Sequence, residues 1–363
     1  MDGEQELATH QGHPLRVLNV SKVQMNPYVL LLQEALAALG VQCSTSAGLS
    51  PRLARSWRGS VDLLHIHWLE LLYEAPRLRQ TLRRWLAVFL GLGRARADGC
   101  RVVYTVHNLS PHEPAYPTIH RLGDAIIFRW ADAVHVHDEE ARRRLAAMHG
   151  RLRGVHVIPH GSYVGAYPNT CSREDARQRL GLGQDHFVFL FLGQIRPYKG
   201  VEDLITAFGQ MADASSELVI AGHVHDPVYA SELSVQTRGN HSIHTWFEYV
   251  QDREVQYFMQ ACDVCVLPYR QVTTSGAGVL AFSFGKPIVA PALGGFVELC
   301  ADGRGFAYDA ADSDGLRHAL QQARQAEIAE AGHKALAWAE AHRWSSLAPR
   351  VVAMYREALG TPG

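Results

Sequence analysis

Residues 187–211, FVFLFLGQIRPYKGVEDLITAFGQM, carry the pattern that decides the fold. Six consecutive apolar residues predict a buried strand, and apolar residues at helical spacing after Val201 predict a helix. Between them lies a loop bounded by Gly193 and Gly200. This order of strand, loop and helix recurs along the chain. Strands that alternate with helices form parallel sheets with right-handed crossovers, so the sequence predicts an α/β fold.

The alternating elements fall into two sets, one in each half of the chain. The predicted strands are 16–20, 62–67, 101–105, 133–137, 155–159, 187–192, 217–221, 263–268 and 287–290. A chain of 363 residues is long for a single core. We therefore expect two doubly wound, Rossmann-like domains facing each other across a cleft. Their expected ranges are 1–165 and 166–345, with a C-terminal helix over 346–363 that packs back on the first domain.

The composition is that of a globular protein, with 47% hydrophobic and 20% charged residues. The net charge of −1 gives no reason to expect nucleic acid as a partner. Residues 1–14 lack the apolar segment of a secretory leader, and no apolar run is long enough to span a membrane, so we expect a cytoplasmic location. Cys262 and Cys265 have the spacing of a metal or redox motif, but their apolar strand predicts buried thiols.

The loop from Gly193 to Gly200 has the composition of a diphosphate-binding site. It contains Arg196 and Lys199, and it ends where the predicted helix begins. Cations at the N-terminus of a helix bind phosphate groups, because the helix dipole and the side chains act in the same direction. Lysine is rare in this chain, with only four residues, so its presence here favours a binding role over that of a solvated loop.

A second candidate phosphate-binding loop precedes the predicted helix 276–284. It consists of small hydroxyl residues and glycine, whose backbone N–H groups can approach a phosphate closely: Thr273, Thr274, Ser275 and Gly276. The same residues would also cap the helix without any ligand. A third segment, 246–250, contains Tyr249; it could hold a nucleobase by stacking, or it could contribute aromatic side chains to the core.

The order of these motifs resembles the donor domain of the GT-B glycosyltransferases, family four and its relatives. The resemblance implies two Rossmann-like domains, a nucleotide-sugar donor held by the second domain, and neither a metal nor another cofactor. The motifs that carry it are Gly193 to Gly200, residues 261–268, residues 285–290 and Gly294-Gly295.

The chain departs from that family at three positions. Gln194 stands where the family has an arginine, and Arg196 can take its place. Retaining members carry two glutamates eight residues apart, at the positions that correspond here to Val272 and Leu280. Because both carboxylates are absent, the retaining chemistry of family four is not expected.

A narrower resemblance is to the xanthan-type bacterial β-mannosyltransferases. It implies transfer of a hexose, mannose in those relatives, from GDP-mannose with inversion. The implied acceptor is lipid-linked or a saccharide, in exopolysaccharide or glycolipid assembly. The resemblance also implies acceptor-side roles for Asn26, Tyr28, His67 and Asn108. The matching segments are 26–28, 64–70, 107–113, 196–202 and 267–269 followed by 275–276.

The candidates for catalysis follow predicted strands in the first half of the chain. An inverting transfer needs a base that takes the proton of the acceptor hydroxyl. Glu113 and Glu70 are the carboxylates best placed for this task, with Glu113 preferred, and His107 matches the histidine that the relatives keep near the donor sugar. Neither a metal site nor a metal-dependent step is expected. The other histidines at strand ends are expected to be core residues: His65, His135 and His137.

Residues 77–101 form a basic segment with seven arginines and a single acid, Asp98. An apolar stretch, 85–90, lies within it. A basic helix with an apolar face can lie on an anionic membrane. The alternative is a helix that covers the sheet and shows its arginines to water. A lipid-linked acceptor favours peripheral contact with the inner face of the cell membrane through 77–101.

Two alternative functions remain open at this point. One is a glycosyltransferase of a soluble small molecule that uses UDP-glucose or another donor. The other is a non-catalytic or NAD-binding Rossmann protein. Against the latter, residues 19–23 after the first predicted strand lack the glycine-rich fingerprint of dinucleotide-binding proteins.

Overall fold

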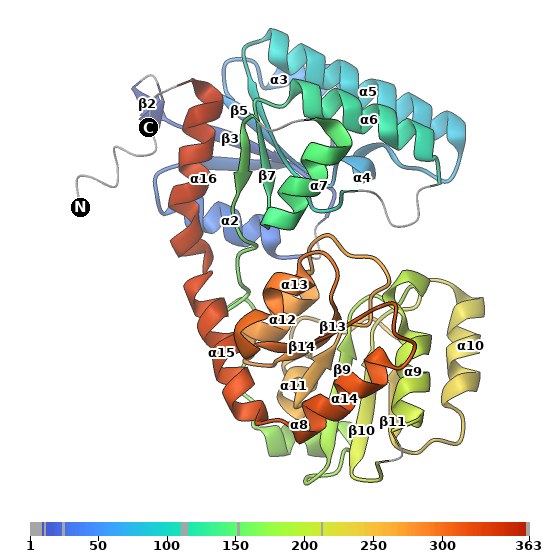
Figure 1. Ribbon diagram of the computed structural model, residues 1–363. Helices are drawn as coiled ribbons and strands as arrows, with labels where there is room; N and C mark the ends of the chain where they lie inside the picture. Colours follow the sequence, from blue (N-terminus) through green and yellow to red (C-terminus); the bar gives the residue numbers. More distant parts are fainter. Residues whose placement is uncertain are drawn as a thin grey trace. The chain divides into compact units, whose positions relative to one another are not determined.

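The computed structural model describes residues 9–10, 12–23, 26–109, 115–150, 153–211 and 213–360. The chain divides into two compact units (Figure 1). Unit 1 comprises residues 1–161 together with 344–363, and unit 2 comprises residues 162–343. The expected boundaries at 165 and 345 lie a few residues further along the chain.

Unit 1 is built on a parallel sheet of six strands in the order β4-β3-β5-β6-β7-β8. The strands are β3 (Arg16–Val20), β4 (Gln42–Ser46), β5 (Leu63–His67), β6 (Arg101–Thr105), β7 (Ala133–Val136) and β8 (Val155–Val157). The helices are α2 (Tyr28–Ala37), α3 (Pro51–Ser56), α4 (Leu69–Tyr73), α5 (Leu78–Ala97), α6 (Pro117–Trp130), α7 (Glu139–His149) and α16 (Trp344–Leu359). A short antiparallel pair, β1 (Thr9–His10) and β2 (His13–Pro14), precedes the sheet.

The two faces of the unit 1 sheet differ because successive side chains of a strand point to opposite sides. On one face, Leu64 and Ile66 belong to an apolar core with residues of α5 and α6. On the other face, Leu63 belongs to a core with residues of α2 and α16, which pack together (Figure 1). The alternation places His65 and His67 on this second face. The face under α2 and α16 therefore carries the polar residues of the strands.

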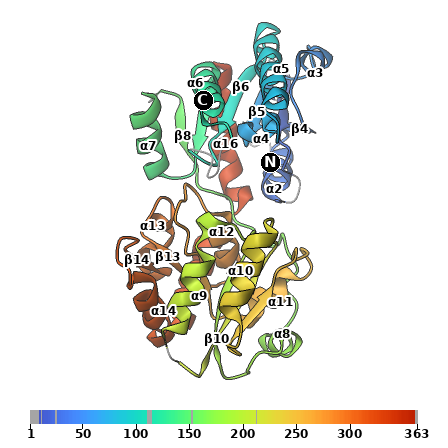
Figure 2. The ribbon, with the colours of Figure 1, turned by 90° about the vertical axis from the view of Figure 1, so that its right-hand side faces the viewer.

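Unit 2 is built on a second parallel sheet of six strands, in the order β11-β10-β9-β12-β13-β14. The strands are β9 (Phe187–Leu192), β10 (Ser216–Ala221), β11 (Ile243–Trp246), β12 (Val264–Val266), β13 (Ile288–Pro291) and β14 (Gly305–Tyr308). Helices α9 and α10 lie side by side (Figure 2). The helices are α8 (Arg173–Leu180), η2 (Pro197–Lys199), α9 (Val201–Gly209), α10 (Pro227–Thr237), α11 (Val255–Ala261), α12 (Gly276–Ser283), α13 (Phe296–Leu299), η3 (Ala301–Gly303), α14 (Gly315–Gln325) and α15 (Ile328–Ala341).

The strand orders fix where each unit can bind a ligand. In unit 2 the order reverses between β9 and β12, and in unit 1 it reverses between β3 and β5. Ligands of doubly wound folds bind beyond the carboxyl ends of the strands at this switch point. The predicted α/β fold with two parallel sheets is confirmed. The loops after these four strands are therefore the expected places for a ligand.

Two further expectations concern membranes and cysteines. Among the described residues, no helix has the length and apolar character needed to cross a membrane. Cys262 and Cys265 are buried, and their sulfur atoms lie 4.0 Å apart as free thiols. Their environment is that of core residues at the start of β12.

Candidate active site

The loop after β9 is a tight turn pressed against the segment after β12. Gly200 has a left-handed backbone with φ of 65°, and a β-carbon there would collide with the carbonyl oxygen of Pro268. Arg270 also joins the two segments: its Nη1 donates to the Pro197 carbonyl at 3.1 Å and its Nη2 to Asp203 Oδ1 at 2.9 Å. These contacts hold η2 in one conformation at the switch point of unit 2.

Lys199 is a half-buried residue whose ammonium group packs against an aromatic ring. No carboxylate among the described residues forms an ion pair with it; its ammonium lies 3.5 Å from the centre of the Tyr269 ring. Burial lowers the pKa of Lys199 to about 7, and the neighbouring charge of Arg196 acts in the same direction. A bound anion would favour the charged form of the Lys199 side chain, so Lys199 is suited to bind an anion.

The second predicted loop meets the first one at Tyr269. Burial raises the pKa of the Tyr269 phenol well above its usual value, and a contact with the Ser275 side chain opposes this shift. Ser275 caps α12, accepting a hydrogen bond from the backbone N–H of Gly278 at 3.2 Å. The Gly295 N–H donates to the Thr273 carbonyl at 2.9 Å, which pins the loop from behind. Lys199 and Ser275, the N-cap of α12, thus both contact Tyr269.

The third predicted segment separates into a packed part and an exposed part. Trp246 packs against Phe258 with ring centres 5.5 Å apart. Tyr249 is 48% exposed beyond the outer strand β11. No contact within the described part of the chain joins Tyr249 to Lys199 or to the 273–276 loop, so its role at the donor site stays a prediction.

The polar face of unit 1 carries a cluster of buried histidines around Tyr28. The ring of Tyr28 lies edge-on to several aromatic rings, with centre distances of 4.8 Å to His107 and to Trp344 and 4.9 Å to His160. Asn26 begins α2 by accepting a hydrogen bond from the Tyr28 N–H at 2.9 Å. The cluster, called the histidine cluster below, consists of His65, His67, His107, His135, His137 and His160.

Two of these histidines are fully hydrogen-bonded core residues. The ring nitrogens of His65 bond to the Tyr355 hydroxyl at 2.7 Å and to the Thr105 hydroxyl at 2.6 Å. Those of His135 bond to the Thr105 hydroxyl at 3.1 Å and to the Ile158 carbonyl at 2.7 Å. The chain from Tyr355 to Ile158 ties α16 to β5, β6, β7 and the segment after β8.

Two predicted acceptor-side residues are fully buried in unit 1. Tyr28 and His67 have no exposed surface. His67 contacts His107, and Tyr28 contacts both, so the acceptor-side roles of Tyr28 and His67 stay predictions. His107 itself is 8% exposed and lies at the end of β6.

Glu70 and Asn108 come together beyond β5 and β6. Asn108 hydrogen-bonds to the Glu70 carboxylate, which lies in the first turn of α4. Burial raises the pKa of Glu70 to about 7, and the charges of Asp124 and Glu74 add to this shift. A carboxylate with this pKa can take a proton near neutral pH. Glu113, the other predicted base, lies outside the described residues.

The backbone of Trp68 departs from the usual conformation of its residue type. Its φ of 45° and ψ of 58° are left-handed, and it directly precedes α4. The indole stacks on His107 with ring centres 3.7 Å apart and an angle of 10°. Non-glycine residues hold such a conformation only where the surroundings enforce it, and they gather at functional sites. Sequence reasoning did not single out Trp68, Asn19 or Asp124.

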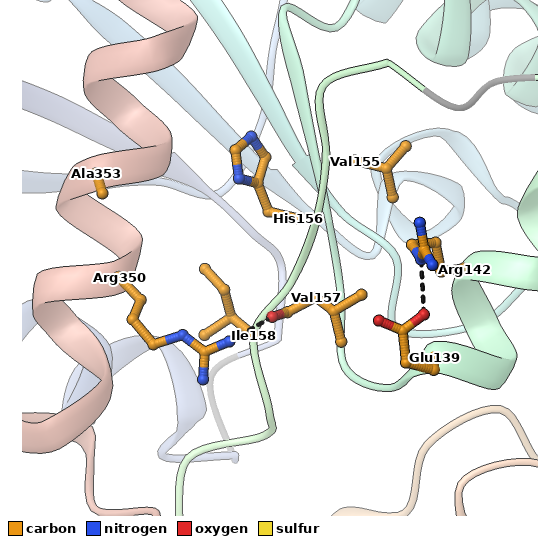
Figure 3. A pocket seen from close by; sticks show the side chains of 8 residues that line it. All are labelled: Glu139, Arg142, Val155, His156, Val157, Ile158, Arg350 and Ala353. Atoms are coloured by element: carbon orange, nitrogen blue, oxygen red, sulfur yellow. Dashed lines mark hydrogen bonds and ion pairs between the residues drawn. The ribbon is translucent and has the colours of Figure 1, made fainter. Parts of the chain in front are cut away.

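A cavity of about 450 Å³ lies elsewhere in unit 1, between α7, β8 and α16 (Figure 3). Its charged groups already have partners: Arg142 pairs with Glu139 at 2.6 Å, and Arg350 donates to the Val157 carbonyl at 2.7 Å. None of the predicted site residues lines it. In the described parts of both units, no group of three histidine, cysteine or acidic side chains could hold a metal ion.

Comparisons with known proteins match most of this chain to glycosyltransferases. Residues 172–341 match the protein family described as Glycosyl transferases group 1. A GDP-mannose:glycolipid 4-beta-D-mannosyltransferase of Xanthomonas campestris pv. campestris is 29% identical over 269 residues, which is 73% of this chain and 70% of that protein.

Two solved structures share the fold over nearly the whole chain. Sucrose-phosphate synthase from Thermosynechococcus elongatus has a TM-score of 0.76, with 16% identity over 95% of this chain and 99% of that one. Anabaena HepE in complex with UDP and glucose has a TM-score of 0.73, with 16% identity over 94% of this chain and 99% of that one.

The two parallel sheets, with their switch-point loops, have the GT-B fold of these neighbours. More particularly, the chain carries a group 1 glycosyltransferase domain over residues 172–341. The enzyme class and the family resemblance predicted from the sequence are confirmed, including the likeness to bacterial β-mannosyltransferases.

Proposed function

We propose that this glycosyltransferase moves a hexose, with mannose favoured, from GDP-mannose to a lipid-linked or saccharide acceptor with inversion. The reaction would serve exopolysaccharide or glycolipid assembly. The observation that carries the donor site is the meeting of Lys199 and the α12 N-terminus at Tyr269. The activity for which the Xanthomonas relative is named supports the choice of mannose and of a glycolipid acceptor.

In the proposed reaction, the acceptor oxygen forms a bond to the anomeric carbon as the bond from that carbon to the diphosphate breaks. Glu70 takes the proton of the acceptor hydroxyl. The diphosphate leaves with the electron pair, and its charge is opposed by Arg196, Lys199 and the positive end of α12. Because protein cations supply this stabilisation, we propose a reaction without a metal cofactor, and chelation with EDTA should leave its rate unchanged.

The donor proposal is tested by measuring the Tm with GDP, UDP, ADP and NAD, since a ligand that binds more tightly stabilises the folded protein more. GDP should raise the Tm most. Lys199→Ala should lower nucleotide affinity roughly ten- to a hundredfold, the usual range for a charged hydrogen bond. Lys334→Ala, which removes a surface ion pair with Glu330, is the matched control and should behave as wild type. An unchanged GDP affinity in Lys199→Ala would refute the diphosphate site.

The stereochemical proposal follows from two apolar positions. Val272 is buried in the loop before α12, and Leu280 lies within α12. Neither side chain can supply the carboxylate of a retaining enzyme. The product from an α-linked donor should therefore be a β-glycoside, which an NMR coupling constant at the anomeric proton measures. An α-linked product would contradict inversion.

A second candidate is transfer from UDP-glucose to a soluble small molecule. The structural likeness to a protein crystallised with UDP and glucose favours it. The same thermal-shift series separates the two candidates, because UDP would then give the largest stabilisation. A response to NAD alone would instead favour the dinucleotide-binding alternative.

We also propose that α5 contacts the membrane surface. Its exposed leucines follow one another at intervals of four residues: Leu78, Leu82, Leu86 and Leu90. The exposed arginines Arg79 and Arg83 lie among them, and the helix contains no acidic residue. An apolar row bordered by cations fits an anionic lipid surface, where the leucines enter the interface and the arginines meet headgroups.

A further inference from the structure

The ring of His107 is held in one orientation, with one nitrogen engaged. Trp68 stacks on its face, and Tyr28 packs edge-on at 4.8 Å between ring centres. Its Nε2 lies 3.2 Å from Nδ1 of His67. Its Nδ1 makes no hydrogen bond to any residue that the structure describes. The second nitrogen is thus available to a ligand.

Asn19 contacts the other side of His67. It lies on β3, at the switch point of unit 1, and its Oδ1 is 3.2 Å from Nε2 of His67. An amide oxygen only accepts hydrogen bonds, so Nε2 of His67 carries the hydrogen in this contact. Asn19 has no exposed surface, and its Nδ2 is without a hydrogen-bond partner among the described residues.

Both rings are neutral, because burial lowers the pKa of His67 to about 3 and that of His107 well below its usual value. A neutral imidazole carries one hydrogen. Since Nε2 of His67 donates to Asn19, its Nδ1 is an acceptor, and the hydrogen between the two histidines belongs to Nε2 of His107. The lone pair of His107 is therefore on Nδ1.

We propose that Asn19 and His67 are positioning residues that hold His107 in the tautomer protonated at Nε2, so that Nδ1 accepts a hydrogen bond from a hydroxyl group of the sugar substrate. The ligand class rests on the proposed function; the tautomer rests on the hydrogen bonds and the burial of residues in unit 1. The arrangement separates the histidine cluster into two parts. His65 and His135 form a closed chain that ends on the Ile158 carbonyl, whereas the chain from Asn19 ends on an open nitrogen.

The first test is the nitrogen NMR spectrum of isotope-labelled histidine side chains in the intact protein, which reports which ring nitrogen carries the hydrogen. The wild type should show His107 protonated at Nε2. The opposite orientation of the Asn19 amide, with its N–H₂ donating to His67, would place the hydrogen of His107 on Nδ1. That spectrum would overturn the proposal without any measurement of activity.

The second test removes the acceptor oxygen. In Asn19→Leu the preference between tautomers should be lost, and kcat should fall about tenfold with the KM for the donor unchanged, the ratio that one hydrogen bond supports. Tyr355→Phe is the matched control, because it deletes a buried hydrogen bond to His65 on the same face. It should lower the Tm and leave both kcat and the His107 spectrum unchanged. An unaltered His107 spectrum in Asn19→Leu would refute the role of Asn19.

A second pair of variants applies if Asn19→Leu does not fold. His67→Asn keeps an acceptor oxygen near the place of Nδ1 and should retain the His107 tautomer, whereas His67→Leu should lose it. Equal spectra for the two would overturn the proposal. The outcome is separable from that of the proposed function: loss of GDP binding would refute the donor site, while the NMR spectrum tests His107 whatever the donor is.

Discussion

At the scale of single residues, Glu70 combines a neutral-pH pKa with a place beside Asn108. Burial raises the pKa of Glu70, and the two neighbouring carboxyl groups of Asp124 and Glu74 raise it further. A general base must be deprotonated to act, so kcat should fall as the pH drops below about 7, the pKa of Glu70. Asp124→Asn removes one of the charges that raise this pKa. It should move the acidic limb of the pH–rate profile to lower pH, while Glu139→Gln on the surface of α7 should not.

Glu70→Gln should lower kcat by roughly 10²–10⁴, the range for loss of a general base, with donor affinity preserved. The same variant should be more stable than wild type above neutral pH. The folded state holds the Glu70 proton more tightly than the unfolded chain, so wild-type stability falls as the pH rises from about 4.5 to about 7. Because glutamine does not titrate, the Glu70→Gln variant does not lose stability in this way. Kinetics and Tm measured together check both effects. Near-normal turnover in Glu70→Gln beside an inactive Glu113→Gln would reassign the base to Glu113.

The residues of the donor loop were predictable because their signal is local. A glycine-bounded loop with Arg196 and Lys199 directly follows an apolar strand, and each of these features is visible within a few positions. The role of Asn19 was not predictable. It depends on a contact with His67, far along the chain, and on the strand order that makes β3 and β5 neighbours. Likewise, nothing in the composition around Trp68 predicts its left-handed backbone.

At the scale of elements, the pattern of hydrophobicity predicted the inner strands of both six-stranded sheets and the edge strand β8, and it missed the edge strands β4, β11 and β14. β9 is an unbroken apolar run and was predicted with its observed bounds. β4, with the sequence QCSTS, lies at the edge of its sheet and contains mostly polar side chains. An edge strand exposes one side to water, so its sequence lacks the apolar run that marks a central strand. For the same reason β11, at the edge of the second sheet, was not predicted.

The surface of α5 provides a test at this scale. Replacing Leu82, Leu86 and Leu90 together by serine removes side chains that are 46%, 53% and 55% exposed, so the fold should be retained. Sedimentation with phosphatidylglycerol vesicles should capture wild type and not the triple variant. Phosphatidylcholine vesicles should capture wild type weakly, because they lack the anionic headgroups that arginine attracts.

The control for the α5 variant is a pair of serine substitutions on α10, at Val228 and Val235, which are 66% and 59% exposed. They remove similar exposed apolar surface from a helix without a row of arginines. This variant should bind vesicles as wild type does. Equal capture of the α5 triple variant and the wild type would exclude α5 as the membrane contact and leave the interpretation of a helix that covers the sheet.

At the scale of the whole molecule, the histidine cluster makes unit 1 sensitive to acid. Burial lowers the pKa of His67 to about 3 and those of His135 and His160 to about 4. The unfolded chain therefore binds more protons than the folded one between these values and the ordinary pKa of 6.5. The stabilising contribution is complete above pH 6.5 and is lost on acidification, by about 1.4 kcal/mol per pH unit for each histidine.

The Tm should consequently fall steeply between pH 6.5 and pH 4, the values that bound the His160 titration. His160→Gln removes one titrating group and should make the dependence of stability on pH shallower. His318→Gln, on the exposed surface of α14, should leave the slope as in the wild type. A slope that is the same in all three proteins would show that other groups govern acid unfolding.

The return of α16 to unit 1 has a consequence for synthesis on the ribosome. Residues 344–359 supply one side of the core that covers the histidine face, and Tyr355 closes its hydrogen-bond chain. Unit 1 starts the chain but needs a helix that is translated after all of unit 2. Unit 2 is contiguous and can fold as soon as it emerges. During translation the N-terminal half is therefore expected to keep an apolar face uncovered until α16 emerges, and such a surface is prone to aggregation.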